Sequence, residues 1–112
     1  MGKFVITQLS NGKYQFNLKS RNGTVILKSD GYVTLFNCKY GIESVKKNSP
    51  FTHRFEKKVT EDGKFYFNLT ASNGRTISVS ELYETAYYRD NGIAAVMRNA
   101  PDAKVEERIQ NE

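Results

Sequence analysis

Apolar and polar residues alternate strictly in a short stretch of the chain that occurs twice. In residues 13–19, KYQFNLK, the residues Tyr14, Phe16 and Leu18 alternate with polar neighbours, and residues 64–70, KFYFNLT, repeat the pattern. Period two with one apolar face indicates a half-buried antiparallel strand. The flanking segments FVITQL and TVILK, with their later counterparts RFEKKV and RTISV, supply neighbouring strands. We predict strands at 4–9, 13–19 and 24–28, and again 51 residues later.

The two copies are related by a constant offset of 51 residues without a gap, so that residues 3–50 lie over residues 54–101. About a third of the aligned pairs are identical. The identical pairs include the segments Phe16-Asn17-Leu18 with Phe67-Asn68-Leu69, Tyr32 with Tyr83, Gly41-Ile42 with Gly92-Ile93, and Pro50 with Pro101. This period is that of one supersecondary unit, and the chain therefore contains an internal repeat.

Turn residues separate the predicted strands at equivalent places in both copies. Asn11-Gly12 and Asp62-Gly63 are dipeptides typical of a two-residue type I′ hairpin turn, in which both central residues have positive φ. Asn22-Gly23 and Asn73-Gly74 repeat this signal eleven residues later. Each copy is therefore expected to begin with a three-stranded meander.

The hydrophobic period then changes to that of a helix. Leu35, Cys38, Ile42 and Val45 form one helical stripe, and in the second copy Ala86, Ile93 and Val96 mark the same stripe, with Arg89 in the place of Cys38. We predict helices at 34–47 and 85–98. Thr34 and Thr85 are expected as N-caps, and Asn48 and Asn99 as left-handed residues after the helix ends.

These elements predict an α+β fold of two tandem β-β-β-α repeats that share one core with pseudo-two-fold symmetry. One copy buries too little apolar surface to be comfortably stable, whereas two copies can share a core. We expect a single domain over 1–112, made of repeat 1 (3–50), repeat 2 (54–101) and a short C-terminal tail (102–112). Gly41 and Gly92 interrupt the predicted helices, which suggests close backbone approach there.

Nearly the whole chain resembles a known family. The run NGKYQFNLKSRNG…GIESVKKNSP and its echo DGKFYFNLTASNG…DNGIAAVMRNAPDAKV are similar to the YegP-like family of small bacterial proteins. The resemblance implies β-β-β-α repeats, in tandem within one chain or singly in chains that dimerise. It implies no catalytic or ligand-binding residues, because the family is uncharacterised.

The composition indicates the cellular compartment and the class of protein. The chain has 112 residues, a single cysteine and no apolar run of the roughly 20 residues that span a bilayer. One cysteine forms no internal disulfide and suits a reducing compartment. We expect a soluble cytoplasmic protein without a membrane association.

Sequence motifs for chemistry are lacking. With one histidine, His53, and one cysteine, Cys38, the chain cannot assemble a Cys/His metal cage, and it has no GxSxG, P-loop or GxGxxG motif. Cys38 lies on the apolar stripe and is expected in the core. The acidic pairs Glu61-Asp62 and Glu106-Glu107 are interpreted as a turn and a polar tail. We expect no enzymatic activity, no cofactor and no bound metal.

Charge is distributed unevenly. Residues 1–53 contain eight Lys/Arg and two Asp/Glu, a net charge of +6, whereas residues 54–112 contain nine and ten, a net charge of −1. A basic half hints at an anionic partner, although a solvated basic surface explains it more simply. The candidate polyanion-binding residues are Lys13, Lys19, Arg21, Lys46 and Lys47, with Arg54, Lys57 and Lys58 as an extension.

Two functions are compatible with these features. The first is a non-enzymatic protein-interaction or structural module, binding an unknown protein partner through an exposed sheet edge. The second, less favoured, is a weak nucleic-acid or polyanion binder that uses the basic first half. Asn17 and Asn68, on the polar faces of the central strands, either bind a ligand or hold a neighbouring loop. A monomer is favoured over a homodimer, because two copies in one chain supply each other's partner surface.

Overall fold

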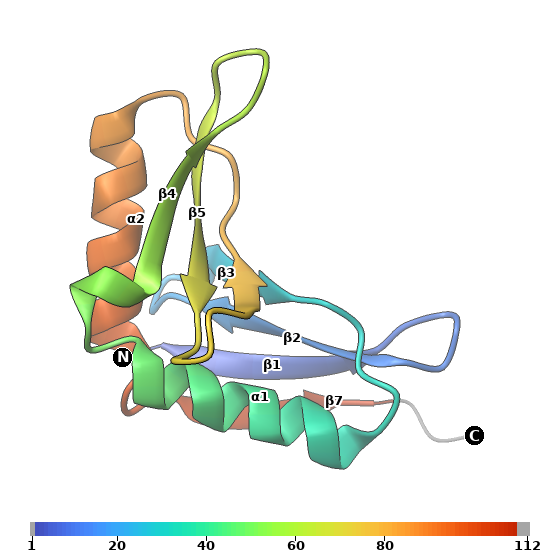
Figure 1. Ribbon diagram of the computed structural model, residues 1–112. Coiled ribbons are helices and arrows are strands. Elements are labelled where there is room, and N and C mark those ends of the chain that lie inside the picture. Colours follow the sequence, from blue (N-terminus) through green and yellow to red (C-terminus); the bar gives the residue numbers. More distant parts are fainter. Residues whose placement is uncertain (1, 110–112) are drawn as a thin grey trace.

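The computed structural model describes residues 2–109, and its elements follow the order of the internal repeat (Figure 1). The first repeat forms β1 (Lys3–Gln8), β2 (Tyr14–Lys19), β3 (Val25–Ser29) and α1 (Leu35–Asn48). After the 3-10 turn η1 (Thr52–Arg54), the second forms β4 (Phe55–Val59), β5 (Phe65–Thr70), β6 (Thr76–Val79) and α2 (Ala86–Asn99), and β7 (Lys104–Arg108) comes last. The predicted tandem β-β-β-α repeats are confirmed.

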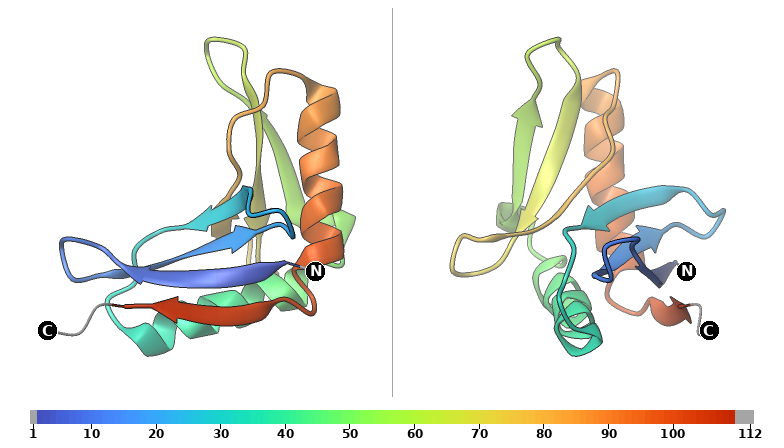
Figure 2. Two further views of the ribbon diagram at one scale, coloured as in Figure 1. Left: turned by 180° about the vertical axis from the view of Figure 1, so that it is seen from behind. Right: turned by 90° about the vertical axis from the view of Figure 1, so that its right-hand side faces the viewer.

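All seven strands belong to one sheet, in the order β4-β5-β6-β3-β2-β1-β7. Each repeat forms an antiparallel meander, and the two meanders join where Lys28 pairs with Val79 and Ser29 with Ser78. The sheet bends at this short junction, so that the strands of one half run across those of the other (Figure 1). Figure 2 shows the same bend from behind and from the side, with α1 and α2 lying along different halves.

One hydrophobic core is shared by both repeats, as predicted. The apolar faces of the strands contribute Phe4, Phe16 and Leu18 from the first half and Phe55, Phe67 and Leu69 from the second. The helices add the predicted stripe residues Cys38, Ile42, Val45, Ile93 and Val96. Helix α1 contacts β2 of its own repeat and β5 and β6 of the other, and α2 contacts β5 and β3. Each helix therefore covers apolar surface that its own repeat cannot bury alone.

The helix starts agree with the prediction and the helix ends do not. The Thr34 hydroxyl accepts a hydrogen bond from the Asn37 N–H at 3.0 Å, and Thr85 caps α2 in the same way. The expected left-handed conformation at Asn48 and Asn99 is wrong. Both residues are helical, and each side-chain amide donates to the carbonyl four residues earlier, at 2.8 and 2.7 Å. The amide thus satisfies a carbonyl near the helix end directly.

The expected type I′ turns are also wrong. Among the described residues, positive φ occurs at four glycines, Gly12, Gly23, Gly63 and Gly74, and at no other residue type. In the first turn the Gly12 N–H donates to the Leu9 carbonyl and the Leu9 N–H donates to the Lys13 carbonyl. This pattern is a type I turn followed by a glycine bulge, which requires positive φ at one residue instead of two. All four turns have it.

Part of the expected C-terminal tail is a strand. Residues 104–108 form β7, which pairs in parallel with β1 from Lys3↔Lys104 to Thr7↔Arg108. Glu106 and Glu107 are therefore not in a solvated tail. Glu106 pairs with Lys3 at 3.0 Å, and Glu107 pairs with Lys39 of α1 at 2.7 Å. Polar side chains here are compatible with a strand because β7 is at the sheet edge.

Candidate functional site

The segment that follows β3 is held in place by Ser29. The Ser29 hydroxyl accepts a hydrogen bond from the Phe16 N–H at 2.9 Å and donates to the Asp30 carbonyl at 2.8 Å. Tyr32 and Tyr14 then exchange backbone hydrogen bonds of 2.8 and 2.6 Å. In the second half, Ser80, Phe67, Glu81, Tyr83 and Phe65 repeat this arrangement. The segment between strand and helix is therefore fixed at both ends.

Tyr32 extends from this segment to helix α1. Its ring stacks on Phe16, with centroids 6.2 Å apart and an interplanar angle of 16°. A Cβ on Gly41 would lie 2.8 Å from the Tyr32 Cζ and closer still to the hydroxyl oxygen. The expected close approach at the helical glycines is thus confirmed, and the partner is a side chain. Burial raises the pKa of Tyr32, with smaller contributions from Cys38 and Asp30.

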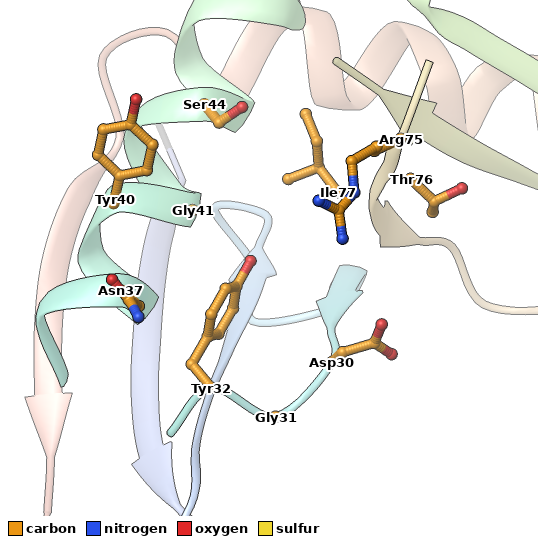
Figure 3. A pocket seen from close by; sticks show the side chains of 10 residues that line it. All are labelled: Asp30, Gly31, Tyr32, Asn37, Tyr40, Gly41, Ser44, Arg75, Thr76 and Ile77. Carbon is orange, nitrogen blue, oxygen red and sulfur yellow. The ribbon is translucent and has the colours of Figure 1, made fainter. Parts of the chain in front are cut away.

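A cavity of about 440 Å³ opens beside Tyr32, between α1, the 30–32 segment and the start of β6. Figure 3 shows the Arg75 guanidinium extending into it from the start of β6 toward the side formed by Tyr32 and Asp30. Asn37 and Ser44 line it from α1. Neither Arg75 nor Asp30 forms an ion pair with another residue between 2 and 109. The arrangement can hydrogen-bond a small polar molecule, and it places no histidine or cysteine on the lining.

Comparison of the two repeats shows whether the fold itself requires this polar lining. At the 51-residue offset, the residue equivalent to Arg75 is Thr24, the one equivalent to Ser44 is Ala95 and the one equivalent to Asn37 is Tyr88. Glu81, the counterpart of Asp30, is engaged by Lys28 at 3.2 Å. The other half therefore builds the same elements without these groups. Sequence reasoning missed this cavity, because its residues come from three segments that only the pseudo-two-fold brings together.

The five basic residues predicted as a polyanion site lie on different elements of the first repeat. Lys13 precedes β2 and Lys19 ends it, which separates them by about 20 Å of extended strand. Lys46 lies on α1 with its Nζ 6.0 Å from the centroid of the Phe4 ring. These three residues therefore lie at the two ends of β2 and on α1.

Arg21 and Lys47, the other two, lie in two clefts related by the pseudo-two-fold. Arg21 shares one cleft, of about 740 Å³, with Arg98. Lys47 shares the other, of about 470 Å³, with Arg54. Each cleft lies between the C-terminal part of a helix and the second turn of a meander. Each holds one pair of cations, and Glu43 also lines the cleft that contains Lys47.

Ion pairs between the halves account for part of the charge asymmetry. Lys3 pairs with Glu106, Lys28 with Glu81 and Lys39 with Glu107, at 3.0, 3.2 and 2.7 Å. In each case a cation of residues 1–53 meets an anion of residues 54–112. All six side chains are about half exposed, and exposed ion pairs add little to the free energy of unfolding. These pairs therefore match the charges of the two halves and contribute little to stability.

The remaining candidate residues are Cys38, Asn17 and Asn68. Cys38 is fully buried, as predicted, and burial raises the pKa of its thiol to about 11. No group of three or more potential metal ligands occurs within residues 2–109. The Asn68 side-chain amide donates to Glu56 at 3.4 Å, whereas the Asn17 Oδ1 is buried without a hydrogen-bond partner among those residues. Within residues 2–109, neither side chain forms a hydrogen bond to a neighbouring loop.

None of the described helices combines the length and the apolar character needed to cross a membrane.

Comparisons with known proteins agree with the internal repeat. The model of a domain of unknown function, DUF1508, matches twice, at residues 10–56 and 61–107. A UPF0339 protein of Bordetella pertussis is 41% identical over 98% of this chain and 99% of its own length. The UPF0339 protein YegP of Escherichia coli K12 is 42% identical over 95% of this chain and 96% of its own.

A solved structure supports the same conclusion. The solution NMR structure of yegP from E. coli, described as a protein of unknown function, superposes with a TM-score of 0.93 at 40% identity. The superposition covers 99% of this chain and 96% of the yegP chain. On its doubled motif, its sequence and its fold, the chain belongs to the YegP-like family of uncharacterised bacterial proteins, UPF0339, in the form that contains two DUF1508 repeats.

Proposed function

We propose that the chain is a non-enzymatic protein-interaction module, and that its contact surface is the outer edge of β4. The observation that supports this is that the outer strands of the two halves differ in how they are covered. β1 and β4 are counterparts in the repeat, and β7 covers the outer edge of β1. No strand of residues 2–109 covers the outer edge of β4. An uncovered edge is a template for an added strand from another chain.

The backbone of β4 offers hydrogen-bonding groups on that open side. Phe67 directs its N–H and its carbonyl toward Ser80 on the far side of β5. Its partner across the β4–β5 pair is Lys57. In an antiparallel pair, residues that do not exchange hydrogen bonds direct their backbone groups away from each other. Lys57 therefore directs its N–H and carbonyl to the open edge.

An exposed aromatic side chain of α2 flanks the same region. Lys57 pairs with Asp90 at 3.4 Å, which places this face of α2 beside β4. Tyr87, one turn earlier on that face, is 71% exposed and lies edge to face with Tyr88. Exposed tyrosines are enriched at protein interfaces, because the ring is large and loses little entropy on binding. Tyr87 gives an added strand a side-chain surface as well as a backbone edge.

Polyanion binding is the alternative function. It is supported by the pairs Arg21 with Arg98 and Lys47 with Arg54, which make two small basic clefts. The dispersal of the other predicted cations argues against a continuous nucleic-acid track, which needs basic groups in a stripe. We therefore favour the β4 edge.

The proposed function is tested by blocking the edge at a single backbone group. Lys57→Pro removes the outward N–H, and Lys57→Ala, the control, keeps it. Both variants and the unmodified chain serve as bait in nuclease-treated extracts of the native host. We expect specific proteins to be retained by the unmodified chain and by Lys57→Ala but lost with Lys57→Pro. Equal retention by all three baits, or none by any, contradicts the proposal.

A further inference from the structure

We infer that the cavity beside Tyr32 binds a free α-amino acid with an uncharged side chain, whose carboxylate meets Arg75 and whose ammonium group meets Asp30. This cavity lies between α1, the 30–32 segment and the start of β6. It is separate from the outer edge of β4, because β5 lies between β4 and β6. A small-molecule site there is additional to the proposed function and does not depend on it.

The cavity lining contains one cation and one anion, and neither has a partner. Arg75 and Asp30 are the charged residues among those that line the cavity, and both are exposed. Neither forms an ion pair with the other or with any other residue between 2 and 109. A ligand with a single charge would be attracted by one of these groups and repelled by the other. A zwitterion satisfies both groups, and a guanidinium can hold a carboxylate with two parallel hydrogen bonds.

Other charged residues near the cavity do not replace either group. Lys28 of β3 pairs with Glu81 at 3.2 Å, so it does not neutralise the carboxylate of the lining. Lys13 lies beside the segment that follows β3 and forms no ion pair within residues 2–109. Glu43 and Lys47 of α1, which carry opposite charges, line the neighbouring cleft. One cation and one anion therefore remain to bind a ligand in the cavity.

Hydrogen-bond donors surround the opening into which the Arg75 guanidinium extends. Figure 3 shows the Tyr32 hydroxyl and the guanidinium directed toward this opening, with the Ser44 hydroxyl facing it from α1. Burial raises the pKa of Tyr32, so its hydroxyl keeps its proton at neutral pH and can donate to a carboxylate. Asp30, two residues before Tyr32, then accepts hydrogen bonds from the ammonium group of the same ligand.

The rest of the lining determines the side chain of the ligand. Ile77 and the ring of Tyr40 supply apolar surface, and the lining has no further charged residue once Arg75 and Asp30 are engaged. A second charge on the ligand would lose water without gaining a partner. The volume of about 440 Å³ lies in the usual range of small-molecule sites. A neutral aliphatic or aromatic side chain therefore fits best.

Comparison of the two repeats separates the lining residues that pack the fold from those that offer polar groups. The lining residues that are identical at the 51-residue offset are Tyr32, Gly41 and Ile77. These residues make packing contacts. Arg75 and Ser44, by contrast, correspond to Thr24 and Ala95. The fold therefore forms without the guanidinium and the Ser44 hydroxyl, which supports a binding role for both.

Titration of the ¹⁵N-labelled full chain tests the class of ligand. The probes are L-leucine, L-methionine and L-phenylalanine, each with its amide, which lacks the carboxylate, and its N-acetyl derivative, which lacks the ammonium group. We expect an amino acid to shift the backbone amides of 30–44 and 75–77, and both of its derivatives to bind at least roughly tenfold more weakly. Binding by none of the three amino acids, shifts centred elsewhere, or equal affinity for a singly charged derivative overturns the inference.

Protein variants assign the two ligand charges to their partners. Arg75→Thr introduces the residue that the other repeat has at this position, so the fold should tolerate it. Arg75→Thr and Asp30→Asn should each weaken binding of the amino acid by roughly tenfold. Arg98→Thr, which removes an exposed cation from another cleft, should leave the affinity unchanged.

The singly charged derivatives complete the assignment. In Arg75→Thr the amino acid should lose its advantage over its amide, because the group that distinguishes a carboxylate from an amide is gone. In Asp30→Asn the advantage over the N-acetyl derivative should be lost in the same way. Unchanged affinity in either variant, or an advantage that persists in both, overturns the inference.

Discussion

The hydroxyl group of Tyr32 occupies the space that a side chain on Gly41 would need. The same relation holds between Tyr83 and Gly92, where a Cβ would lie 2.7 Å from the tyrosine Cζ. Each tyrosine also stacks on the central phenylalanine of its repeat, Phe16 or Phe67. A helix interior normally disfavours glycine, so the packing of the tyrosine against the helix outweighs helix propensity at both positions.

Replacing Gly41 by alanine is therefore expected to destabilise the protein. Alanine gains about 1 kcal/mol of helix propensity, but forcing the tyrosine away costs about 1–3 kcal/mol. We expect a net loss of about 1 kcal/mol in the free energy of unfolding, measured by urea denaturation. Tyr32→Phe combined with Gly41→Ala should recover part of the loss, because the hydroxyl makes the closest contact. Additive effects of the two substitutions would contradict a direct contact.

Stability is expected to fall at high pH because of Cys38. Burial raises the pKa of its thiol from the ordinary value of 9.0 to about 11. The unfolded chain then releases the proton before the folded chain does, so this contribution is complete below pH 9 and is lost as the pH rises toward 11. Burial raises the pKa of Tyr32 and Tyr83 in the same sense.

The measurement is the free energy of unfolding across this pH range for the native chain and for Cys38→Ala. The free energy of unfolding should fall less steeply with pH in the alanine variant. In that variant the tyrosines still titrate, but the Cys38 thiol no longer contributes. Identical slopes in the two proteins would show that the thiol titrates alike in the folded and unfolded states.

The sequence predicted those elements whose pattern the core dictates. Tyr14, Phe16 and Leu18 alternate because one face of β2 is buried, and the helix stripe through Cys38 has the matching helical period. β7 escaped prediction, because KVEER has four exposed positions and no apolar alternation. Its strand conformation depends on pairing with β1, almost the full chain length away.

The candidate sites were harder to predict for a related reason. Arg75 meets Asp30 and Ser44 around one cavity because β3 pairs with β6, and nothing local to these residues signals that pairing. The basic residues were grouped by charge alone. Strand length places Lys13 and Lys19 apart, and the pseudo-two-fold divides Arg21 from Lys47.

Binding to nucleic acid is expected to be weak and only mildly dependent on salt. Each basic cleft holds two cations, so one bound strand neutralises few phosphates. The logarithm of the affinity should then fall with the logarithm of salt concentration with a slope no steeper than about −2. Fluorescence anisotropy with labelled single-stranded RNA and duplex DNA measures this slope. A slope of about −5 would mean that all five predicted cations bind together.

The last prediction concerns the number of chains in the particle. The β1 edge is already covered by β7 within the chain, and the β4 edge carries the charged side chains of Glu56, Lys57 and Lys58, which disfavour pairing with another edge strand. We therefore expect a monomer of 12.8 kDa by light scattering at micromolar concentration. Lys57→Val with Lys58→Val removes two of these charges and adds apolar surface to the open strand, so this variant should shift toward dimers. Lys46→Val with Lys47→Val, which changes the same residue types on α1, should remain monomeric. A native particle of roughly twice the chain mass, unaffected by salt, would mean that the charges on the β4 edge do not control association.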